Sequence, residues 1–210
     1  MRTCVLVFDG VDELDFVAPY EILHRAARLT GRDRVALVTA SPQEEVVAAH
    51  GLRVRPDGAL AGPVDLLVVP GGGWVSGAPR GVRAEVERGT LPRAVAALHA
   101  EGAVVAAVCT GAMVLARAGL LAGRPATTHH GALDDLRAAA ARLVDARVVD
   151  DGDVVTCGGV SAGLDLALWL VERFWGSDVA ARVARAVEHE RTSDVYVTAR
   201  AGDATRAAGG

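Results

Sequence analysis

Short valine-rich segments alternate with longer helix-forming segments along most of this 210-residue chain. The strand segments are continuously apolar, which is typical of strands buried on both faces. Their alternation with helices is typical of parallel βαβ units and predicts a doubly wound α/β sandwich, with a mostly parallel sheet and helices on both faces. We predict strands at 3–8, 34–39, 65–69, 103–108 and 153–157, and helices at 16–30, 90–101, 110–118, 131–143, 161–175 and 177–190.

Two local signals refine this architecture. Asp151 and Gly152 separate two valine-rich runs, so they predict a late β-hairpin. Residues 50–58 have the polar alternation of an exposed edge strand or arm. Without an internal repeat or a long linker, we expect a single domain over 1–191, followed by a polar and flexible tail over 192–210.

Composition excludes several classes of function. All 22 Lys+Arg residues are arginine, so the chain cannot perform Schiff-base or pyridoxal chemistry with a lysine amine, and it has no phosphate-binding loop of the type that ends in lysine. The net charge of -4 and the pI near 5.9 come without any cluster of arginines. Nucleic acid is therefore not an expected partner.

The N-terminus and the cysteines indicate a cellular location. The apolar start of the chain is interrupted by Asp9, which is typical of a first strand and not of a secretion signal, and no segment reaches the ~18 apolar residues of a membrane span. We therefore expect a cytoplasmic protein without a membrane partner. Cys4, Cys109 and Cys157 are odd in number and widely spaced, so they suggest neither a disulfide framework nor a metal site.

The residues directly after each strand are the candidates for catalysis and binding, because ligands bind beyond the carboxyl ends of strands in open α/β sheets. Cys109 lies between a buried strand and a helix, with Gly111 two positions on, which is the pattern of a nucleophile elbow. At a helix N-terminus the thiolate should be favoured and its pKa lowered. The alternative is a buried structural cysteine, which we expect for Cys4 and Cys157 inside strands.

Three consecutive glycines follow another strand. The amides of Gly71, Gly72 and Gly73 can approach a ligand closely and donate to a developing anion beside Cys109. Alternatively, the glycines only permit a tight turn. A dinucleotide site is disfavoured, because that fingerprint follows the first strand and has different spacing. Trp74, directly after the glycines, is a candidate for the wall of the substrate pocket, as is Phe16.

Asp15 differs from the other acids of its loop because it stands between Leu14 and Phe16. Burial on this apolar side would raise its pKa and let the protonated carboxyl donate a hydrogen bond to a thiolate. Pro19 should then occupy the first turn of the following helix.

His129 and His130 follow a short strand candidate, RPATT. They are either surface groups or a proton shuttle for the site. The remaining histidines stand in helix or edge contexts and are expected to be structural or solvated: His24, His50, His99 and His189.

Four segments together resemble the DJ-1/PfpI superfamily, which is related to class I glutamine amidotransferase domains. They are FDGVDELDFVAP, VVPGGG, VCTGAMVLARAGLLAGRPATTHH and TCGGVSAGLDLALWLVE. The resemblance extends from Met1 to about Arg191 and is nearest to the branch with isocyanide hydratases and the ligand-binding halves of AraC-type regulators. It implies a flavodoxin-like fold, a homodimer and no cofactor, with Cys109 as the nucleophile and Asp15 as the loop acid. It also implies that the amides of Gly71 and Gly72 face the cysteine.

Two positions distinguish the branches of this superfamily. The protease-like branch carries histidine after the cysteine, whereas this chain has Thr110, which argues against peptidase chemistry. Chaperone and glyoxalase-type relatives often carry glutamate where this chain has Asp15, which favours the hydratase branch. The regulator branch carries an additional helix-turn-helix region, which is absent from this sequence. One departure is that VEHERTSDVYV lacks the proline-rich stretch of the hydratases.

The resulting hypothesis is a cofactor-free isocyanide hydratase acting on a small electrophilic substrate. The Cys109 thiolate attacks the isocyanide carbon, Asp15 supplies a proton, and Thr110 orients the substrate together with amides near Gly71 and Gly72. One alternative is a glyoxalase-type enzyme acting on α-oxoaldehydes. Another is a non-enzymatic redox or small-molecule sensor in which Cys109 is oxidised to a sulfinate.

Overall fold

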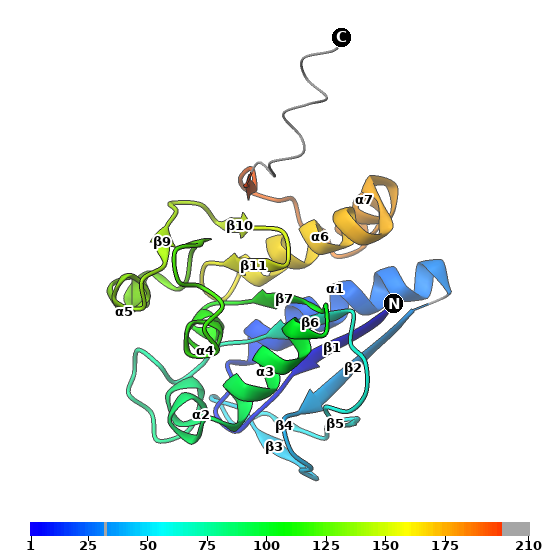
Figure 1. Cartoon of the computed structure of the whole chain (residues 1–210). Coiled ribbons are helices and arrows are strands. Elements are labelled where there is room, and N and C mark those ends of the chain that lie inside the picture. Colours follow the sequence, from blue (N-terminus) through cyan, green and yellow to red (C-terminus); the bar gives the residue numbers. More distant parts are fainter. Residues whose placement is uncertain (32, 199–210) are drawn as a thin grey trace.

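The computed structural model describes residues 1–31 and 33–198. The main sheet has the strand order β12-β10-β11-β7-β6-β1-β2-β5, and every neighbouring pair is parallel except β10 and β11 (Figure 1). Its strands are β1 (Arg2–Leu6), β2 (Arg34–Thr39), β5 (Gly58–Ala59), β6 (Leu66–Val69), β7 (Val104–Ala107), β10 (Val148–Asp150), β11 (Val154–Cys157) and β12 (Tyr196–Val197).

Helices cover both faces of this sheet. One layer contains α1 (Glu13–Thr30), α6 (Ala162–Trp175) and α7 (Ser177–Ala186), which pack against one another. The other contains α2 (Val82–Arg88), α3 (Thr90–Ala100) and α4 (Gly111–Arg117), with α5 (Leu133–Ala138) next to α4 and a short 3-10 turn (His130–Ala132) next to α5. Two small sheets pair β3 (Val46–Val47) with β4 (Arg53–Val54), and β8 (Pro125–Ala126) with β9 (Arg142–Leu143).

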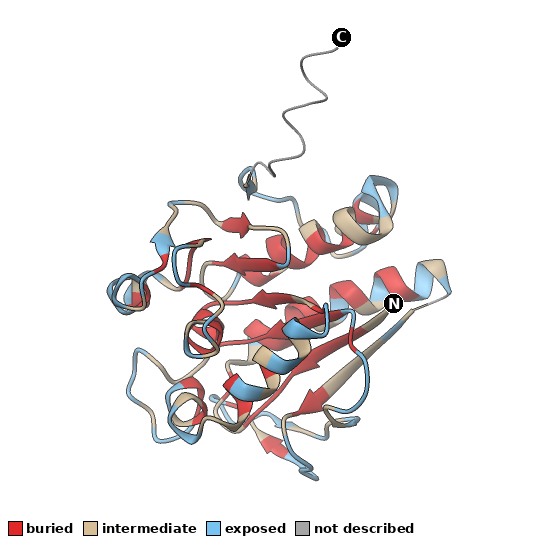
Figure 2. Ribbon diagram, in the orientation of Figure 1, coloured by how far each residue is buried: buried red, intermediate tan, exposed pale blue. Residues whose placement is uncertain are grey.

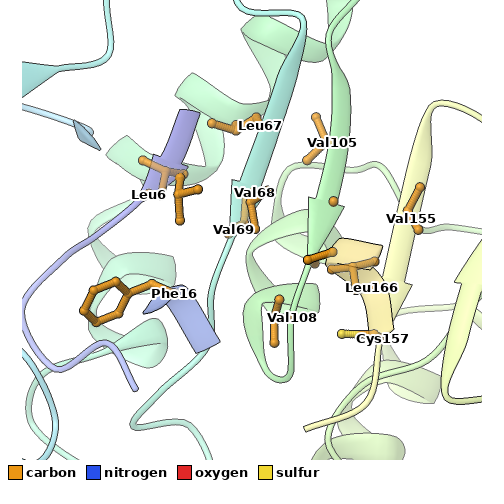
Figure 3. Packing of buried hydrophobic residues seen from close by; sticks show 14 of the residues in the cluster. Leu6, Phe16, Leu67, Val68, Val69, Val105, Val108, Val155, Cys157 and Leu166 are labelled. Atoms are coloured by element: carbon orange, nitrogen blue, oxygen red, sulfur yellow. The ribbon is translucent and has the colours of Figure 1, made fainter. Parts of the chain in front are cut away.

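The core lies along the central strands, which are buried along most of their length (Figure 2). Valines of β6, β7 and β11 face the helices on either side, and Phe16 of α1 extends the cluster beyond the strand ends (Figure 3). Each fully buried side chain of this size contributes about 1.5–3 kcal/mol relative to exposure to water. Coverage on both faces is therefore what the continuously apolar strand segments require.

The predicted fold class is confirmed, as are the five predicted strands and the antiparallel hairpin at Asp151 and Gly152. The prediction of one helix over 131–143 is wrong. Helix α5 ends at Ala138, and Ala140 has a φ of 63°, which reverses the chain so that the following residues pair as β9 with β8. Tertiary strand pairing thus overrides the helix propensity of an alanine-rich segment.

Helix α1 begins earlier than predicted. The Asp12 side chain caps it by accepting a hydrogen bond from the Leu14 N–H at 3.2 Å, so the first turn contains Asp15 and Pro19 lies in the helix interior, not in the first turn. Since proline has no N–H, the carbonyl of Asp15 lacks its usual partner four residues on.

The last residues that the structure describes pair with the main sheet. Residues 196–197 of the expected tail form β12 against β10, whereas residues 199–210 lie outside the described part. Among the described residues, no helix is both long enough and apolar enough to span a bilayer. The cytoplasmic location stays a prediction.

Candidate active site

Cys109 lies on the turn between β7 and α4, at the carboxyl edge of the sheet. Its φ of 56° is a left-handed conformation that side chains rarely adopt. The turn is held by the Cys109 N–H, which donates to the Gly158 carbonyl at 3.0 Å, and by the Thr128 hydroxyl, which donates to the Cys109 carbonyl at 2.8 Å. A Cβ at Gly111 would lie 2.1 Å from the Val69 carbonyl oxygen, so only glycine fits there. The predicted strand-to-helix turn is present.

Asp15 is fully buried in the first turn of α1, beside Cys109. Its Oδ2 accepts a hydrogen bond from the Gly71 N–H at 3.1 Å, whereas Oδ1 has no partner of ordinary geometry among the described residues. Burial, followed by the charge of Asp12, raises the pKa of Asp15 to about 7. This carboxyl can therefore hold a proton near neutral pH.

The thiol of Cys109 does not have the lowered pKa that its helix-start position predicts. Burial raises its pKa to about 12, with a further contribution from the negative charge of Asp15. The N–H groups of Thr110 and Val160 act in the opposite direction. They do not prevail because α4 has only seven residues and because the sulfur is removed from water. Asp15 and Cys109 thus form a coupled pair that holds two protons below about pH 7 and one proton above it.

The amides of Gly71 and Gly72 donate hydrogen bonds to side chains of the protein and hold them in position. The Gly71 N–H donates to Asp15, and the Gly72 N–H donates to Thr110 Oγ1 at 3.1 Å. In this structure both amides donate to protein groups, and their donation to a substrate anion stays a prediction. A Cβ at Gly71 would lie 2.6 Å from Thr110 Oγ1 and 2.8 Å from Asp15 Oδ2, and a Cβ at Gly73 would lie 2.4 Å from the Arg80 carbonyl oxygen. Glycine is required here for close packing of the backbone.

Val160 belongs to the site but was missed in the sequence. It lies in the loop between β11 and α6, and its φ of 49° is a strained value for a β-branched residue. Its N–H lowers the pKa of both Cys109 and Asp15. This amide reaches the pair from the β11 side, whereas the Gly71 N–H reaches Asp15 from the β6 side. The signal was available in TCGGVSAG, where a valine follows two glycines at a strand end.

His129 adjoins the Val160 loop, whereas His130 is exposed. The Nδ1 of His129 accepts a hydrogen bond from the Gly131 N–H at 3.0 Å, so a neutral ring carries its proton on Nε2. Burial, followed by the charge of His130, lowers the pKa of His129. Because a Cβ at Gly159 would lie 2.4 Å from His129 Cδ2, the ring packs directly against this glycine.

Trp74 and Phe16 do not line the groove next to the site. The groove has a volume of about 910 Å³ and includes Thr128, His129 and Val160. Trp74 donates from Nε1 to Asp135 of α5 at 2.6 Å, which ties the glycine loop to that helix. Phe16 is 2% exposed and lies in the core, as Figure 3 shows.

The other cysteines and histidines lie where their sequence contexts predict. Cys4 and Cys157 are fully buried at strand positions. His99 contacts the exposed carboxylate of Asp153, His189 contacts the buried carboxylate of Asp165, and the side chain of His50 is 77% exposed.

A buried cysteine on a strand-to-helix turn, next to a buried carboxyl at the edge of a flavodoxin-like sheet, defines an α/β protein whose cysteine has the backbone geometry of an elbow. The DJ-1/PfpI family model matches residues 1–173. The chain belongs to the DJ-1/PfpI family, as its sequence motifs predict.

Individual relatives differ in the activities that their names give. The isonitrile hydratase of Pseudomonas putida is 36% identical over 190 residues, which cover 88% of this chain and 76% of that protein. A deglycase of Pyrococcus abyssi is 31% identical over 160 residues, covering 74% and 89%. The crystal structure of a THiJ/PfpI family protein from Pseudomonas syringae has a TM-score of 0.78 at 28% identity, covering 99% of this chain and 83% of that one. These relatives are thus named for more than one activity.

Proposed function

We propose that this protein is a cofactor-free hydratase that adds water to an isocyanide, also called an isonitrile, to give an N-formamide. The observation that supports this most is the buried carboxyl of Asp15, which holds a proton near neutral pH beside the Cys109 thiol. Hydration of an isocyanide needs a nucleophile and a proton donor at the same carbon atom. The similarity to an isonitrile hydratase also supports the proposal.

The single proton of the pair resides mainly on the Cys109 sulfur, and the reaction begins from the minor form in which this proton has moved to Asp15 and Cys109 is a thiolate. The sulfur attacks the terminal carbon of the isocyanide, and Asp15 transfers its proton to that carbon, which gives a covalent thioimidate. The N–H groups of Thr110 and Val160, which already favour the thiolate, stabilise it before the attack.

Water completes the cycle. The Asp15 carboxylate removes a proton from a water molecule that adds to the thioimidate carbon, and passes this proton to the nitrogen. The carbon–sulfur bond then breaks while the Asp15 carboxylate removes the proton of the new hydroxyl group, which releases the N-formamide and returns the sulfur to Cys109 as a thiolate. One substrate and one water give one product, and Asp15 regains its proton.

Thr110 and His129 are the proposed substrate contacts. The Thr110 hydroxyl accepts from the Gly72 N–H, and none of the described residues accepts its own hydrogen, so it can donate to the substrate. His129 presents Nε2–H beside the Val160 loop when neutral. Gly71, Gly72 and Gly73 contribute indirectly, because they position Asp15 and Thr110.

Purified protein incubated with an alkyl or aryl isocyanide should produce the corresponding formamide, and Cys109→Ala should show no turnover above buffer. The thiol is the only nucleophile in this mechanism, so its removal eliminates the covalent step. Formamide is measured by chromatography. Equal rates for the wild type and Cys109→Ala would exclude the proposal.

The pH dependence follows from the coupled pair. The reactive form holds one proton, whereas the pair holds two below the Asp15 pKa of about 7. We therefore expect kcat/KM for formamide formation to rise about tenfold per pH unit in the acid range and to level off above about pH 7. Initial rates from about pH 5 to 9 check this, with a pH-independent profile as the contrary result.

A second candidate is a glyoxalase-type enzyme, in which the same thiolate adds to an α-oxoaldehyde. The similarity to a deglycase favours it. Consumption of methylglyoxal with formation of lactate, without formamide formation from isocyanides, would select this candidate. If neither substrate is turned over, the sensor hypothesis remains, in which Cys109 takes up oxygen or binds a metabolite.

We also propose a homodimer, which the family resemblance implies. Helix α1 carries three large hydrophobic side chains on the surface: Leu14, Val17 and Leu29 are 51%, 36% and 42% exposed. An exposed apolar face of this kind is typical of an interface. A light-scattering mass equal to that of a single chain would exclude it.

A further inference from the structure

Cys157 ends β11 directly beside the strand that leads to Cys109. The β7–β11 register pairs Thr156 with Ala107, and the Cys109 N–H donates to the Gly158 carbonyl at 3.0 Å. The pairing thus continues past the ends of both strands, with Cys157 next to Val108. Gly158 directly faces Cys109, and Cys157 is the residue before Gly158.

The positions of the two cysteines suit a covalent bond. Neighbouring strands lie about 4.8 Å apart and rise about 3.3 Å per residue, which places the Cα atoms of Cys109 and Cys157 roughly 6 Å apart on the diagonal. Disulfides span Cα separations of about 4.4–6.8 Å.

The side chain of Cys157 also faces the site. Figure 3 shows its sulfur directed toward the turn that carries Val108. After burial, the negative charges of Asp15 and of Cys109 further raise the pKa of Cys157, so this sulfur lies close to both members of the pair. Cys4 is equally buried, but its strand β1 is separated from β11 by β6 and β7.

We propose that Cys157 is the resolving thiol for oxidised Cys109 and forms a reversible disulfide with it. In the first step the Cys109 thiolate attacks an oxygen of a hydroperoxide, which gives a sulfenic acid and, after protonation, an alcohol or water. In the second step the Cys157 sulfur attacks the Cys109 sulfur, and the hydroxyl group leaves as water. The hydroperoxide takes up two electrons in all, one from each sulfur.

Asp15 can move the proton that this second step requires. Its carboxylate accepts the proton of the Cys157 thiol and passes it to the departing hydroxyl group, so Asp15 is unchanged at the end. The product blocks the nucleophile while protecting it from the irreversible sulfinic and sulfonic states. A thiol reductant then restores both cysteines. The proposal does not depend on which substrate Cys109 attacks.

The test is oxidation of the full-length protein with one equivalent of hydrogen peroxide, followed by thiol blocking and non-reducing digestion at arginine. Each cysteine lies in a different arginine-bounded peptide, 3–25, 94–117 or 148–173. We expect peptide 94–117 linked to 148–173, with a loss of two hydrogen masses that dithiothreitol reverses. Cys4→Ala, the matched control for a buried strand cysteine, should behave as the wild type.

Cys157→Ala should instead gain oxygen at Cys109, since no second thiol can condense with the sulfenic acid. Two outcomes would overturn the proposal. One is a wild-type protein that gains two oxygens on peptide 94–117 without any linked peptide. The other is a linkage between two copies of peptide 94–117. Both measurements on the wild type remain informative even if Cys157→Ala does not fold.

Discussion

Asp15→Asn is expected to lower kcat/KM for isocyanide hydration about 10²–10⁴-fold, the range for loss of a proton-transfer group. The same substitution should make Cys109 react faster with iodoacetamide near neutral pH. The negative charge of Asp15 raises the pKa of Cys109, so a neutral amide leaves more of the thiol ionised. Loss of turnover combined with faster alkylation would separate proton donation from activation of the sulfur.

Asp15→Asn should also stabilise the fold in alkaline solution. The pKa of Asp15 rises from 3.8 to about 7 on folding, so the stabilising proton is fully bound below the unfolded value and is lost as the pH rises through the folded one. Above about pH 8, wild-type protein therefore carries a penalty of about 2–4 kcal/mol that the uncharged variant avoids. Urea denaturation near about pH 8 and pH 4 measures this difference.

Asp178→Asn is the matched control, because Asp178 occupies the first turn of α7 and is exposed. It should change neither turnover nor alkylation. Wild-type turnover in Asp15→Asn, or slower alkylation of Cys109, would contradict the proposed role of the carboxyl.

Gly111→Ala is expected to lower the free energy of unfolding by at least about 3 kcal/mol, at the upper end of overpacking effects. The new Cβ would lie 2.1 Å from the Val69 carbonyl oxygen and 2.9 Å from that of Pro70. Both contacts are with backbone, so no side chain can rotate to relieve them. Thermal and urea unfolding, with the yield of soluble protein, measure the loss.

Gly58→Ala provides the comparison for this glycine. Nothing lies within 4 Å of a Cβ at that position, so the substitution should change stability by no more than about 0.5 kcal/mol. Similar stabilities for Gly111→Ala and Gly58→Ala would mean that the turn beneath Cys109 can move.

The sequence was sufficient to predict the sheet, the strand-to-helix turn that carries Cys109 and the burial of Asp15. Continuous valine-rich runs specify buried strands, and a cysteine between such a run and a helix specifies an elbow. Asp15 was identified from its apolar neighbours, and the structure indeed buries it beside Cys109. For the strands, the turn and the buried carboxyl, the neighbouring residues in the sequence are enough to predict the structure.

The protonation of the site and the direction of its amides could not be predicted. The pKa of Cys109 depends on its burial and on its separation from Asp15, and these are set by the packing of α1 against the sheet. Likewise, the amides of Gly71 and Gly72 are used by Asp15 and Thr110, which are distant in the chain. Only the assembled fold brings such donors and acceptors together.

Four separate segments of the chain form the site, each following a different strand of the main sheet. They supply Asp15, Gly71, Cys109 and Val160. No fragment that lacks one of them can reproduce the environment of the thiol. In a partly folded chain Cys109 is thus an ordinary accessible cysteine, and it becomes slow to alkylate only when the last of these segments docks. The alkylation rate during refolding would consequently report completion of the whole fold, and not formation of any single helix or strand.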